Sequence, residues 1–347
     1  VRVAWLAGKV TGKARAQVLA QVASGEAQLV VGTHALMQES VVFHDLGLAI
    51  VDEQHRFGVH QRLALRDKGA GVDRVPHQLV MTATPIPRTL AMAAYADLDV
   101  SAIDELPPGR TPVQTVALSA ERRPELVERI RAACAEGRQA YWVCTLIDDS
   151  DEVVAQAAQT TYEALSASLP ELRVALVHGR MKAADKQATM RRFKEGEADL
   201  LVATTVIEVG VDVPNASLMI IENAERLGLA QLHQLRGRVG RGATASSCVL
   251  MYQPPLSAMA RHRLATMRET NDGFVIAEKD LELRGPGELL GTRQTGLAAF
   301  RVADLARDAG LLPQVHALAE RLLAEEPSIA DRVIRRWVGG AARYASA

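Results

Sequence analysis

The chain has 347 residues with a formal net charge of −1, and 48% of its residues are hydrophobic. This length is enough for two domains with an appendage, and this composition indicates a soluble globular protein with ordinary cores. No apolar run approaches the roughly 20 residues that span a bilayer, which excludes a membrane-spanning helix and makes the cytoplasm the expected location.

Short β-rich apolar runs alternate with helix-length segments, which is the pattern of parallel βαβ units. In the opening third these runs cover residues 3–6, 28–32, 48–51 and 78–82, with a helix expected over residues 13–23. A polar, proline-rich stretch then interrupts the alternation, and we interpret residues 107–113 as an interdomain linker. Residues 1–106 are predicted to be an incomplete domain, because the opening strand would need a preceding strand and helix to give a sheet of normal size.

A second alternating set predicts a complete sheet in a domain over residues 114–255. Its strands are expected at residues 115–118, 140–144, 174–178, 200–204, 218–221 and 248–252. Beyond this set the strands stop, and helices are expected in residues 256–300 and in a C-terminal tail, residues 301–347. One apolar helical face in the tail comprises Val315, Leu318, Ala319, Leu322 and Leu323. The predicted fold class is α/β, with two parallel-sheet domains in tandem and a helical C-terminal tail.

The cysteines and the local charge give weaker signals. Cys134, Cys144 and Cys248 form no CxxC pair, so we expect buried thiols and neither a disulfide framework nor a zinc cluster. Residues 226–301 hold eleven lysines and arginines against six acidic residues. This excess can mark a local nucleic-acid surface, although a solvated helical face is the alternative.

The most specific pattern lies at residues 48–58, where an apolar strand runs into Asp-Glu-Gln-His-Arg-Phe-Gly. Asp52 and Glu53 then stand at the carboxyl edge of a parallel sheet, where open α/β sheets place their ligands. Asp52 can hold a magnesium ion, directly or through water, while Glu53 orients and deprotonates the water that attacks a γ-phosphate. An exposed acidic pair is the alternative, and Gln54 and His55 favour the functional interpretation.

Residues 82–88, Thr-Ala-Thr-Pro-Ile-Pro-Arg, again follow an apolar strand. The hydroxyls of Thr82 and Thr84 can hydrogen-bond to the carboxylate site and report the state of a nucleotide toward DNA. A helix N-cap before Pro85 is the alternative, and the two interpretations are compatible.

Residues 203–214 join a strand of the second domain to a loop of hydroxyl, glycine and carboxylate groups. We expect Thr204, Thr205 and Glu208 to face DNA or the network that couples the domains. Asp212 can meet the ribose of a nucleotide. An ordinary turn is the alternative for the Gly-Val-Asp sequence that begins at Gly210.

Residues 231–242 read Gln-Leu-His-Gln-Leu-Arg-Gly-Arg-Val-Gly-Arg-Gly. Arg238 and Arg241 are three residues apart and would share one face of a helix. Their planar, permanently charged guanidinium groups suit the dispersed charge of a transferring phosphoryl group, which is the arginine-finger role. A basic surface helix is the alternative, but two glycines inside it are unfavourable for a helix with only a surface role.

A Gly-rich loop ending in Gly-Lys-Thr or Gly-Lys-Ser, whose amides and lysine hold ATP phosphates, does not occur in the sequence. The nearest match, residues 8–13, has a spacer one residue too short, and Ala14 stands where a magnesium-binding hydroxyl is needed. We interpret Gly12 and Lys13 instead as the connector into the first helix. We therefore expect that the chain alone does not hydrolyse ATP.

The four segments that begin at residues 48, 82, 203 and 231, in this order across two α/β sets, resemble the motifs of superfamily 2 helicases. This resemblance implies tandem RecA-like domains of the P-loop NTPase type around a cleft that binds ATP with Mg²⁺. It assigns the Asp52-Glu53 segment to magnesium and water activation, and Thr82 and Thr84 to coupling. The residues that it assigns to the γ-phosphate are Gln234, Arg238 and Arg241.

Residues 273–296 indicate which superfamily 2 helicases the chain resembles. They are similar to a translocation motif shared by the RecG family and the transcription-repair coupling factor. Arg-Gly-Pro-Gly-Glu at residues 284–288 and Gly-Thr-Arg-Gln at residues 291–294 fit the RecG family better, although a plain loop is the local alternative for the first. In this family a helical hairpin and a loop convert closure of the ATP cleft into movement on duplex DNA. The residues expected in this lever are Arg261, Arg263, Arg268, Arg284, Gly285 and Gln294.

The resemblance to the RecG family implies an ATP-dependent DNA helicase that works as a monomer on branched duplex DNA. Such a helicase remodels stalled replication forks and migrates Holliday junctions in recombination and repair. The OB-fold module that splits junction arms in this family has no counterpart in the sequence, so we expect a part of a longer helicase. Two alternatives stay open, a transcription-repair coupling translocase and a non-catalytic module that holds DNA weakly through its basic tail.

Overall fold

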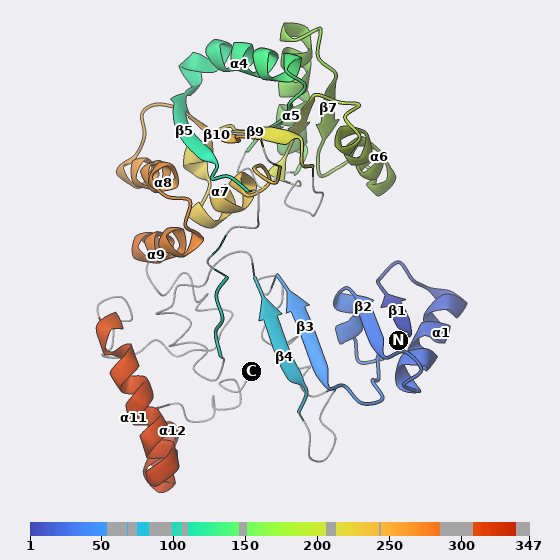
Figure 1. Ribbon diagram of the computed structural model, residues 1–347, viewed down its shortest axis with the longest axis vertical. Helices are drawn as coiled ribbons and strands as arrows, with labels where there is room; N and C mark the ends of the chain where they lie inside the picture. Colours follow the sequence, from blue (N-terminus) through green and yellow to red (C-terminus); the bar gives the residue numbers. More distant parts are fainter. Residues whose placement is uncertain are drawn as a thin grey trace. The chain divides into compact units, whose positions relative to one another are not determined.

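The computed structural model describes residues 1–53, 68, 75–82, 99–103, 105, 110–145, 151–205, 213–242, 244–284 and 308–337. The chain divides into two compact units, which Figure 1 shows. The first consists of Val1–Ala83, Met92–Asp97 and Pro286–Ala347, and the second of Thr84–Ala91 and Leu98–Gly285. The finer domain boundaries expected from the sequence stay predictions.

The described strands of the first unit form two separate parallel pairs. β1 (Val3–Leu6) pairs with β2 (Leu29–Gly32), and β3 (Leu48–Asp52) pairs with β4 (His77–Met81). α1 (Gly12–Ala23) connects β1 to β2 and begins at Gly12, whose φ is +60°, so these residues form the expected connector into a helix. A short 3-10 helix, η1 (His34–Met37), follows β2. The small core of β1, β2 and α1 consists of Ala4, Leu6, Val22, Ala27, Ala35 and Val41.

The second unit is built on a six-stranded parallel sheet with the strand order β5-β10-β9-β6-β8-β7. These strands are β5 (Gln114–Ser119), β6 (Gln139–Val143), β7 (Val174–Val177), β8 (Leu200–Ala203), β9 (Ala216–Ile221) and β10 (Ser247–Tyr252). All ten strands expected in the chain are confirmed, each within two residues of its expected bounds. The prediction of an α/β fold with parallel sheets is therefore confirmed.

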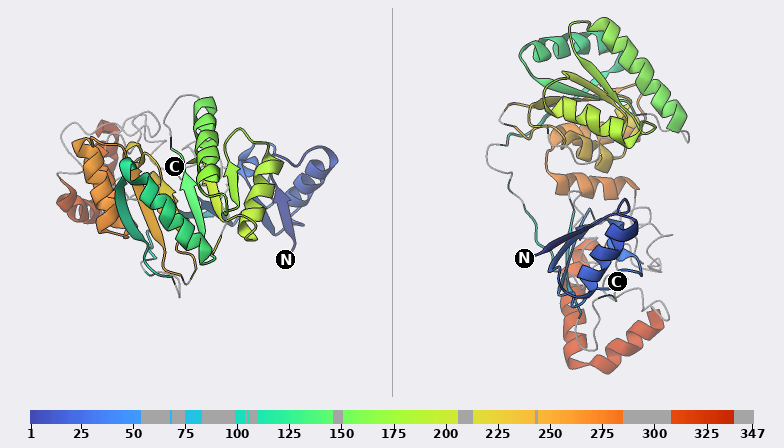
Figure 2. Two further views of the ribbon diagram at one scale, coloured as in Figure 1. Left: turned by 90° about the horizontal axis from the view of Figure 1, so that it is seen from above. Right: turned by 90° about the vertical axis from the view of Figure 1, so that its right-hand side faces the viewer.

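Helices cover both faces of this sheet (Figure 2). On β6, Ala140 and Trp142 belong to the core that includes α4 (Arg123–Ala135) and α5 (Asp151–Ser168). Tyr141 and Val143 belong to the opposite core, which includes α6 (Ala183–Lys194) and α7 (Leu229–Arg236). Short 3-10 helices, η3 (Ala120–Arg122) and η5 (Ala224–Arg226), precede α4 and α7. Burial on both faces explains why β8, and β6 after its first residue Gln139, show no alternation of apolar and polar residues.

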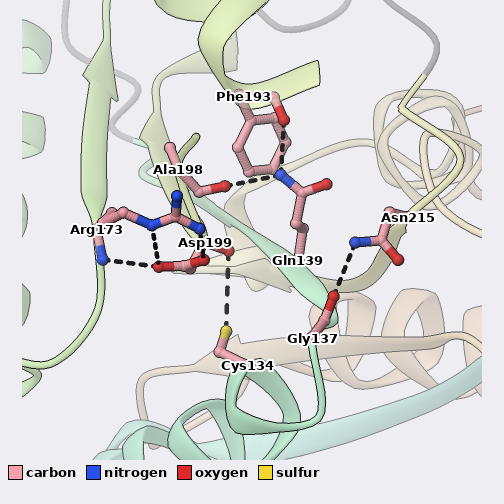
Figure 3. A network of polar contacts seen from close by, with 8 residues as sticks. All are labelled: Cys134, Gly137, Gln139, Arg173, Phe193, Ala198, Asp199 and Asn215. Atoms are coloured by element: carbon pink, nitrogen blue, oxygen red, sulfur yellow. Dashed lines mark hydrogen bonds and ion pairs between the residues drawn. The ribbon is translucent and has the colours of Figure 1, made fainter. Parts of the chain in front are cut away.

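A polar network ties together the amino ends of β6, β7 and β8 (Figure 3). The side-chain amide of Gln139 donates to the carbonyl oxygens of Phe193 and Ala198 at 2.6 and 2.7 Å. Arg173 precedes β7 and forms an ion pair with Asp199, which precedes β8, at 2.6 Å. These bonds satisfy buried polar groups within the protein, so this edge of the sheet stabilises the fold and the carboxyl edge carries the residues singled out in the sequence.

Helices follow the second sheet and form the end of the described chain. α8 (Ala258–Glu269) and α9 (Gly273–Arg284) belong to the second unit and pack against α7. After η6 (Ala309–Leu311) come α11 (Leu312–Glu325) and α12 (Pro327–Trp337) of the first unit. The expected helical tail is confirmed, but the apolar face on α11 is open to solvent, since Val315 and Leu323 are 56% and 60% exposed.

The three cysteines are free and buried, as expected from the sequence. Burial raises the pKa of Cys134 to about 11 and that of Cys248 to about 12, so both thiols are protonated at neutral pH. Within the described ranges we find no cluster of three His, Cys, Asp or Glu side chains suited to a metal ion. The same ranges contain no helix of the length and apolarity that crossing a membrane requires.

Candidate functional site

The carboxylate pair stands at the carboxyl end of β3. Asp52 is the last residue of this strand and is exposed, while Glu53 is half-buried. The backbone of Glu53 has a φ of 55°, in the left-handed region, and its amide donates to the Asp52 Oδ1 atom at 2.9 Å. A non-glycine residue held in this region costs on the order of 1–3 kcal/mol, and such residues cluster at functional sites.

The register of β3 and β4 brings the Thr82 hydroxyl to the same edge of the strand pair as Asp52. β3 and β4 pair with Asp52 opposite Met81, so Thr82 follows at the same end of the pair. Thr82 is half-buried. The structure therefore brings together Asp52, Glu53 and Thr82 within the first unit. The other expected site residues of this region, Gln54, His55 and Thr84, lie outside the described residues.

In the second unit Thr204 and Thr205 follow β8. The Thr204 amide extends the sheet by donating to the Val177 carbonyl oxygen at 3.2 Å, and Thr204 is 2% exposed. Its hydroxyl is buried and has no hydrogen-bond partner in the part of the chain that the structure describes. Thr205 is half-buried. Three further residues expected here, Glu208, Gly210 and Asp212, lie outside the described residues.

Sequence reasoning missed a group of basic side chains that follows β7 and consists of His178, Arg180 and Lys186. His178 follows β7 in register with Thr204, and its Nδ1 atom is buried and lacks a hydrogen-bond partner among the described residues. Burial lowers the pKa of His178, and the charges of Lys186 and Arg180 lower it further. The signal was the sequence Val-His-Gly-Arg at residues 177–180, directly after a predicted strand.

The structure corrects the helical spacing considered for Arg238 and Arg241. α7 ends at Arg236. Gly237 follows as its C-cap with helical angles, and Gly240, with a φ of +77°, turns the chain away from the helix. Gln234 is therefore on α7, whereas Arg238 and Arg241 lie in the turn that follows it. A Cβ atom on Gly240 would stand 2.7 Å from Val113 Cγ2, so the backbone of this turn requires a glycine at position 240.

Arg236, which the sequence did not single out, fixes the end of α7 to α8. It is 3% exposed and donates to the carbonyl oxygens of Met267 and Thr270 at 2.9 and 2.8 Å. It also donates to Nδ1 of His233 at 3.1 Å, which requires a neutral imidazole. Burial, and then the charge of Arg236, lowers the pKa of His233 to about 4, so the ring is neutral at pH 7.

Arg263 on α8 connects that helix back to the segment that precedes α7. Its guanidinium donates to the carbonyl oxygens of Glu225 and Leu227 at 2.7 and 3.0 Å, in the segment that leads into α7. Two arginines therefore join α7 and α8, each through backbone carbonyl oxygens of the other region. Arg261 and Arg268 are exposed on the same helix. Arg284 is the last residue of α9, and Gly285 and Gln294 lie outside the described residues.

Three family models match the chain. A model of the DEAD/DEAH box helicase domain matches residues 1–93, and one of the helicase conserved C-terminal domain matches residues 123–243. The third, the C-terminal part of domain 3 of ATP-dependent DNA helicase RecG, matches residues 270–334. Together they cover both units and the helices that follow the second sheet.

Individual proteins named ATP-dependent DNA helicase RecG are similar to this chain over nearly its whole length. The chain is 66% identical to ATP-dependent DNA helicase RecG of Pasteurella multocida over 97% of its own length and 49% of that protein. It is 65% identical to RecG of Escherichia coli (strain K12), over 100% of this chain and 50% of that protein.

A solved structure of RecG bound to a three-way DNA junction gives a TM-score of 0.66 at 46% identity, covering 90% of this chain and 40% of that one. The chain therefore spans about half the length of the curated relatives it matches, and the RecG model at residues 270–334 agrees with the RecG interpretation rather than the coupling-factor one. The chain belongs to the family of ATP-dependent DNA helicase RecG.

Proposed function

We propose that this chain carries the motor of an ATP-dependent DNA helicase that acts on branched duplex DNA. In this proposal the whole protein is a cytoplasmic monomer that remodels stalled replication forks and migrates Holliday junctions. The main support is the strained Asp52-Glu53 pair at the end of β3, in a chain that matches RecG helicases along nearly all of its length.

Glu53 is the proposed general base for ATP hydrolysis. It orients a water molecule and takes its proton as the oxygen attacks the γ-phosphorus. Arg238 and Arg241 stabilise the negative charge that develops on the phosphoryl oxygens, with Gln234 at the same phosphate. Asp212 binds the ribose. The carboxylates of one unit and the guanidinium groups of the other are thus proposed to serve one nucleotide.

Asp52 is suited to hold the Mg²⁺ ion that accompanies ATP. One of its oxygens accepts the Glu53 amide, and the residue is exposed at the strand end. Mg²⁺ usually takes one or two carboxylates, keeps several waters and binds the phosphates of its substrate, so a single aspartate fits. Bound Mg²⁺ would neutralise charge on the β- and γ-phosphate oxygens.

Thr82 and Thr84 are proposed to carry the state of the nucleotide from the carboxylate pair toward DNA, with Thr205, Glu208 and Gly210 in the corresponding role in the second unit. Thr204 and the basic group of His178, Arg180 and Lys186 are proposed to hold a DNA phosphate. Their support is the buried Thr204 hydroxyl and His178 Nδ1, whose hydrogen-bonding capacity a phosphate oxygen or an intervening water would satisfy.

The α8–α9 helices are proposed as the lever that moves DNA. Arg236 and Arg263 join α7 to α8 through short bonds to backbone carbonyl oxygens, so a displacement of the Arg238–Arg241 turn would reach α8. Arg261 and Arg268 are exposed and suited to DNA phosphates. Arg284, Gly285 and Gln294 complete the proposed lever.

These 347 residues alone are expected to hold DNA weakly without hydrolysing ATP, because their sequence has no Gly-Lys-Thr or Gly-Lys-Ser loop. Exposed Arg261 and Arg268 favour this second, non-catalytic role of the isolated chain. Binding carried by phosphate contacts should weaken steeply with salt. Salt-independent binding, or ATP turnover by the isolated chain, would contradict this expectation.

The catalytic proposal is best tested in a chimera in which this chain replaces the matching half of RecG of E. coli (strain K12). We expect ATP hydrolysis that a three-way junction stimulates, and unwinding of that junction. Glu53→Gln should lower the stimulated rate by about 10²–10⁴-fold, because the general base is lost. Glu39→Gln, an exposed carboxylate of the same unit, is the matched control and should leave the rate unchanged.

Two results would count against this function. One is a chimera that folds and binds junctions without junction-stimulated ATP hydrolysis. The other is stimulated hydrolysis that Glu53→Gln leaves intact. Binding of RNA polymerase by an active chimera with no activity on forks would favour the coupling translocase instead.

A further inference from the structure

The turn between β9 and α7 is anchored to its surroundings at several points. It begins at Glu222, whose amide donates to the Val143 carbonyl oxygen at 2.9 Å. Asn223 follows in the left-handed conformation, with a φ of 46°. At the other end the Gly228 amide donates to the Gln231 side chain at 3.2 Å as α7 begins. The conformation of this turn therefore sets the direction in which α7 leaves the sheet.

Thr145, two residues beyond β6, is both a hydrogen-bond donor and a hydrogen-bond acceptor to this turn. Its hydroxyl donates to the Glu222 carbonyl oxygen, and its own carbonyl oxygen accepts from the Asn223 side-chain amide at 3.3 Å. Thr145 is 2% exposed, so water does not readily replace these bonds. Loss of the hydroxyl would remove the donor from a carbonyl oxygen in a buried position.

Arg123, at the start of α4, holds the Glu222 side chain. Its guanidinium forms an ion pair with the Glu222 Oε1 atom at 2.7 Å and lies over the Trp142 ring, 4.9 Å from the ring centroid. Trp142 is fully buried and Glu222 is 8% exposed, so both partners of Arg123 are fixed by the core. A buried carboxylate needs such a partner, because an unpaired one is costly to desolvate.

We infer that Thr145, Glu222 and Arg123 are positioning residues that place α7 and, through it, Arg238 and Arg241. This inference rests on the proposed function, because those two arginines are assigned there to the γ-phosphate. α7 is an eight-residue helix about 12 Å long. Because α7 is one uninterrupted helix, a tilt at the turn moves its far end, and Arg238 and Arg241 follow directly after that end.

The test compares two substitutions of one residue. Thr145→Val keeps the shape and removes the hydroxyl, whereas Thr145→Ser keeps the hydroxyl. In the 347-residue chain, Thr145→Val should raise hydrogen–deuterium exchange of amides in residues 222–236, and Thr145→Ser should not. In the chimera, Thr145→Val should lower kcat for junction-stimulated ATP hydrolysis about tenfold or more, because displacements near 1 Å can cost that much. KM for ATP should change by less than about twofold, since the guanidinium groups act mainly on the transition state.

Combination with Arg241→Ala separates positioning from a merely structural role. If Thr145 acts through Arg238 and Arg241, and these two arginines act as a unit on the γ-phosphate, the double variant should be no slower than Arg241→Ala alone. Unchanged exchange in Thr145→Val would overturn the inference, as would a double variant in which the two losses multiply. If Arg241→Ala itself leaves the rate of the chimera unchanged, the proposed function fails, and the inference fails with it.

Glu222→Gln offers an independent check through the Arg123 pair. It should lower kcat in the same way, and this loss too should vanish in the Arg241→Ala background. A Glu222→Gln chimera that hydrolyses ATP at the parent rate, with an intact second unit by circular dichroism, would also contradict the inference.

Discussion

The two units contain strands of similar apolar composition, yet their sheets are covered differently. In β6 and β8 of the second unit every residue is buried. In β1 and β3 of the first unit buried and exposed residues alternate, so that Trp5 and Ile50 are each 56% exposed. An apolar run therefore does not by itself tell whether one face of a strand is covered or both.

The two units also differ in the surroundings of the proposed catalytic residues. In the second unit a core closed on both faces supports α7 and the arginines after it, through buried bonds such as those of Arg236. In the first unit the proposed catalytic carboxylates, Asp52 and Glu53, stand at the end of β3, where the Glu53 backbone is strained. Substitutions of the same kind should therefore have unequal effects in the two units.

Two tryptophans provide the largest expected contrast. Trp142 is fully buried, and Trp142→Ala should cost about 3–5 kcal/mol of unfolding free energy because it leaves a large cavity. Trp5→Ala should cost less than about 1 kcal/mol, since more than half of that side chain is already in water. Urea unfolding followed by far-UV circular dichroism measures both. Equal losses would remove the distinction between the two sheets.

Two glycines provide the next contrast. Gly240 has a φ of +77° and lies close to Val113, so Gly240→Ala should cost on the order of 1–2 kcal/mol or more. Gly8 in the first unit has open space where a Cβ atom would stand, and Gly8→Ala should be neutral within about 0.5 kcal/mol. Thermal unfolding of both variants is the measurement. A neutral Gly240→Ala would show that the turn after α7 tolerates another conformation.

Matched ion pairs at the amino ends of parallel strands provide a smaller contrast. Hydrogen bonds from Arg173 hold the pKa of Asp199 below its usual range. The stabilisation by this pair is therefore present above the unfolded pKa of about 4 and is lost as pH falls through the lower folded value. Asp199→Asn should cost about 0.5–1 kcal/mol at pH 7 and less at pH 3.

The corresponding pair of the first unit, Arg2 with Glu26, has both side chains exposed, at 58% and 47%. Glu26→Gln should therefore change the unfolding free energy by less than about 0.5 kcal/mol. Urea titrations at pH 7 and pH 3 compare the two variants. A cost of Asp199→Asn that is the same at both pH values would show that the carboxylate charge is not what stabilises the network of Figure 3.

The last contrast concerns the exposed face of β3 and β4. Ile50→Thr and Leu79→Thr should each change the unfolding free energy by less than about 1 kcal/mol, because these side chains are 56% and 49% exposed. They should lower binding of a hydrophobic dye and slow aggregation, since contiguous apolar surface promotes both. Leu200→Thr, at a fully buried position of β8, is the contrasting substitution and should be strongly destabilising.

The strands could be predicted because their apolar runs are local and bounded by turn residues. The carboxylate pair, the hydroxyls after β4 and β8 and the arginines after α7 could be singled out because each follows a predicted element directly. The end of α7 was harder to predict from the sequence. Residue spacing placed Arg238 and Arg241 on one helical face, and the glycines at 237 and 240 were the local sign that the helix stops first.

Other parts could not be predicted because they depend on residues far apart in the chain. Thr145 bonds to Asn223, 78 residues away, and Arg236 reaches Met267 across 31 residues. Likewise, nothing local distinguishes Arg236, which is buried, from Arg238, which is only half-buried two residues later. Such roles follow from packing, which a single sequence does not reveal.

The central claim, that carboxylates of the first unit and guanidinium groups of the second act on one nucleotide, is tested most directly by single-turnover ATP hydrolysis in the chimera. Glu53→Gln should slow the step by about 10²–10⁴-fold, and Arg241→Ala by about 10³-fold or more. Because residues that act together are not additive, the double variant should be little slower than the slower single variant. Two losses that multiply, or a parent rate in either single variant, would contradict the claim.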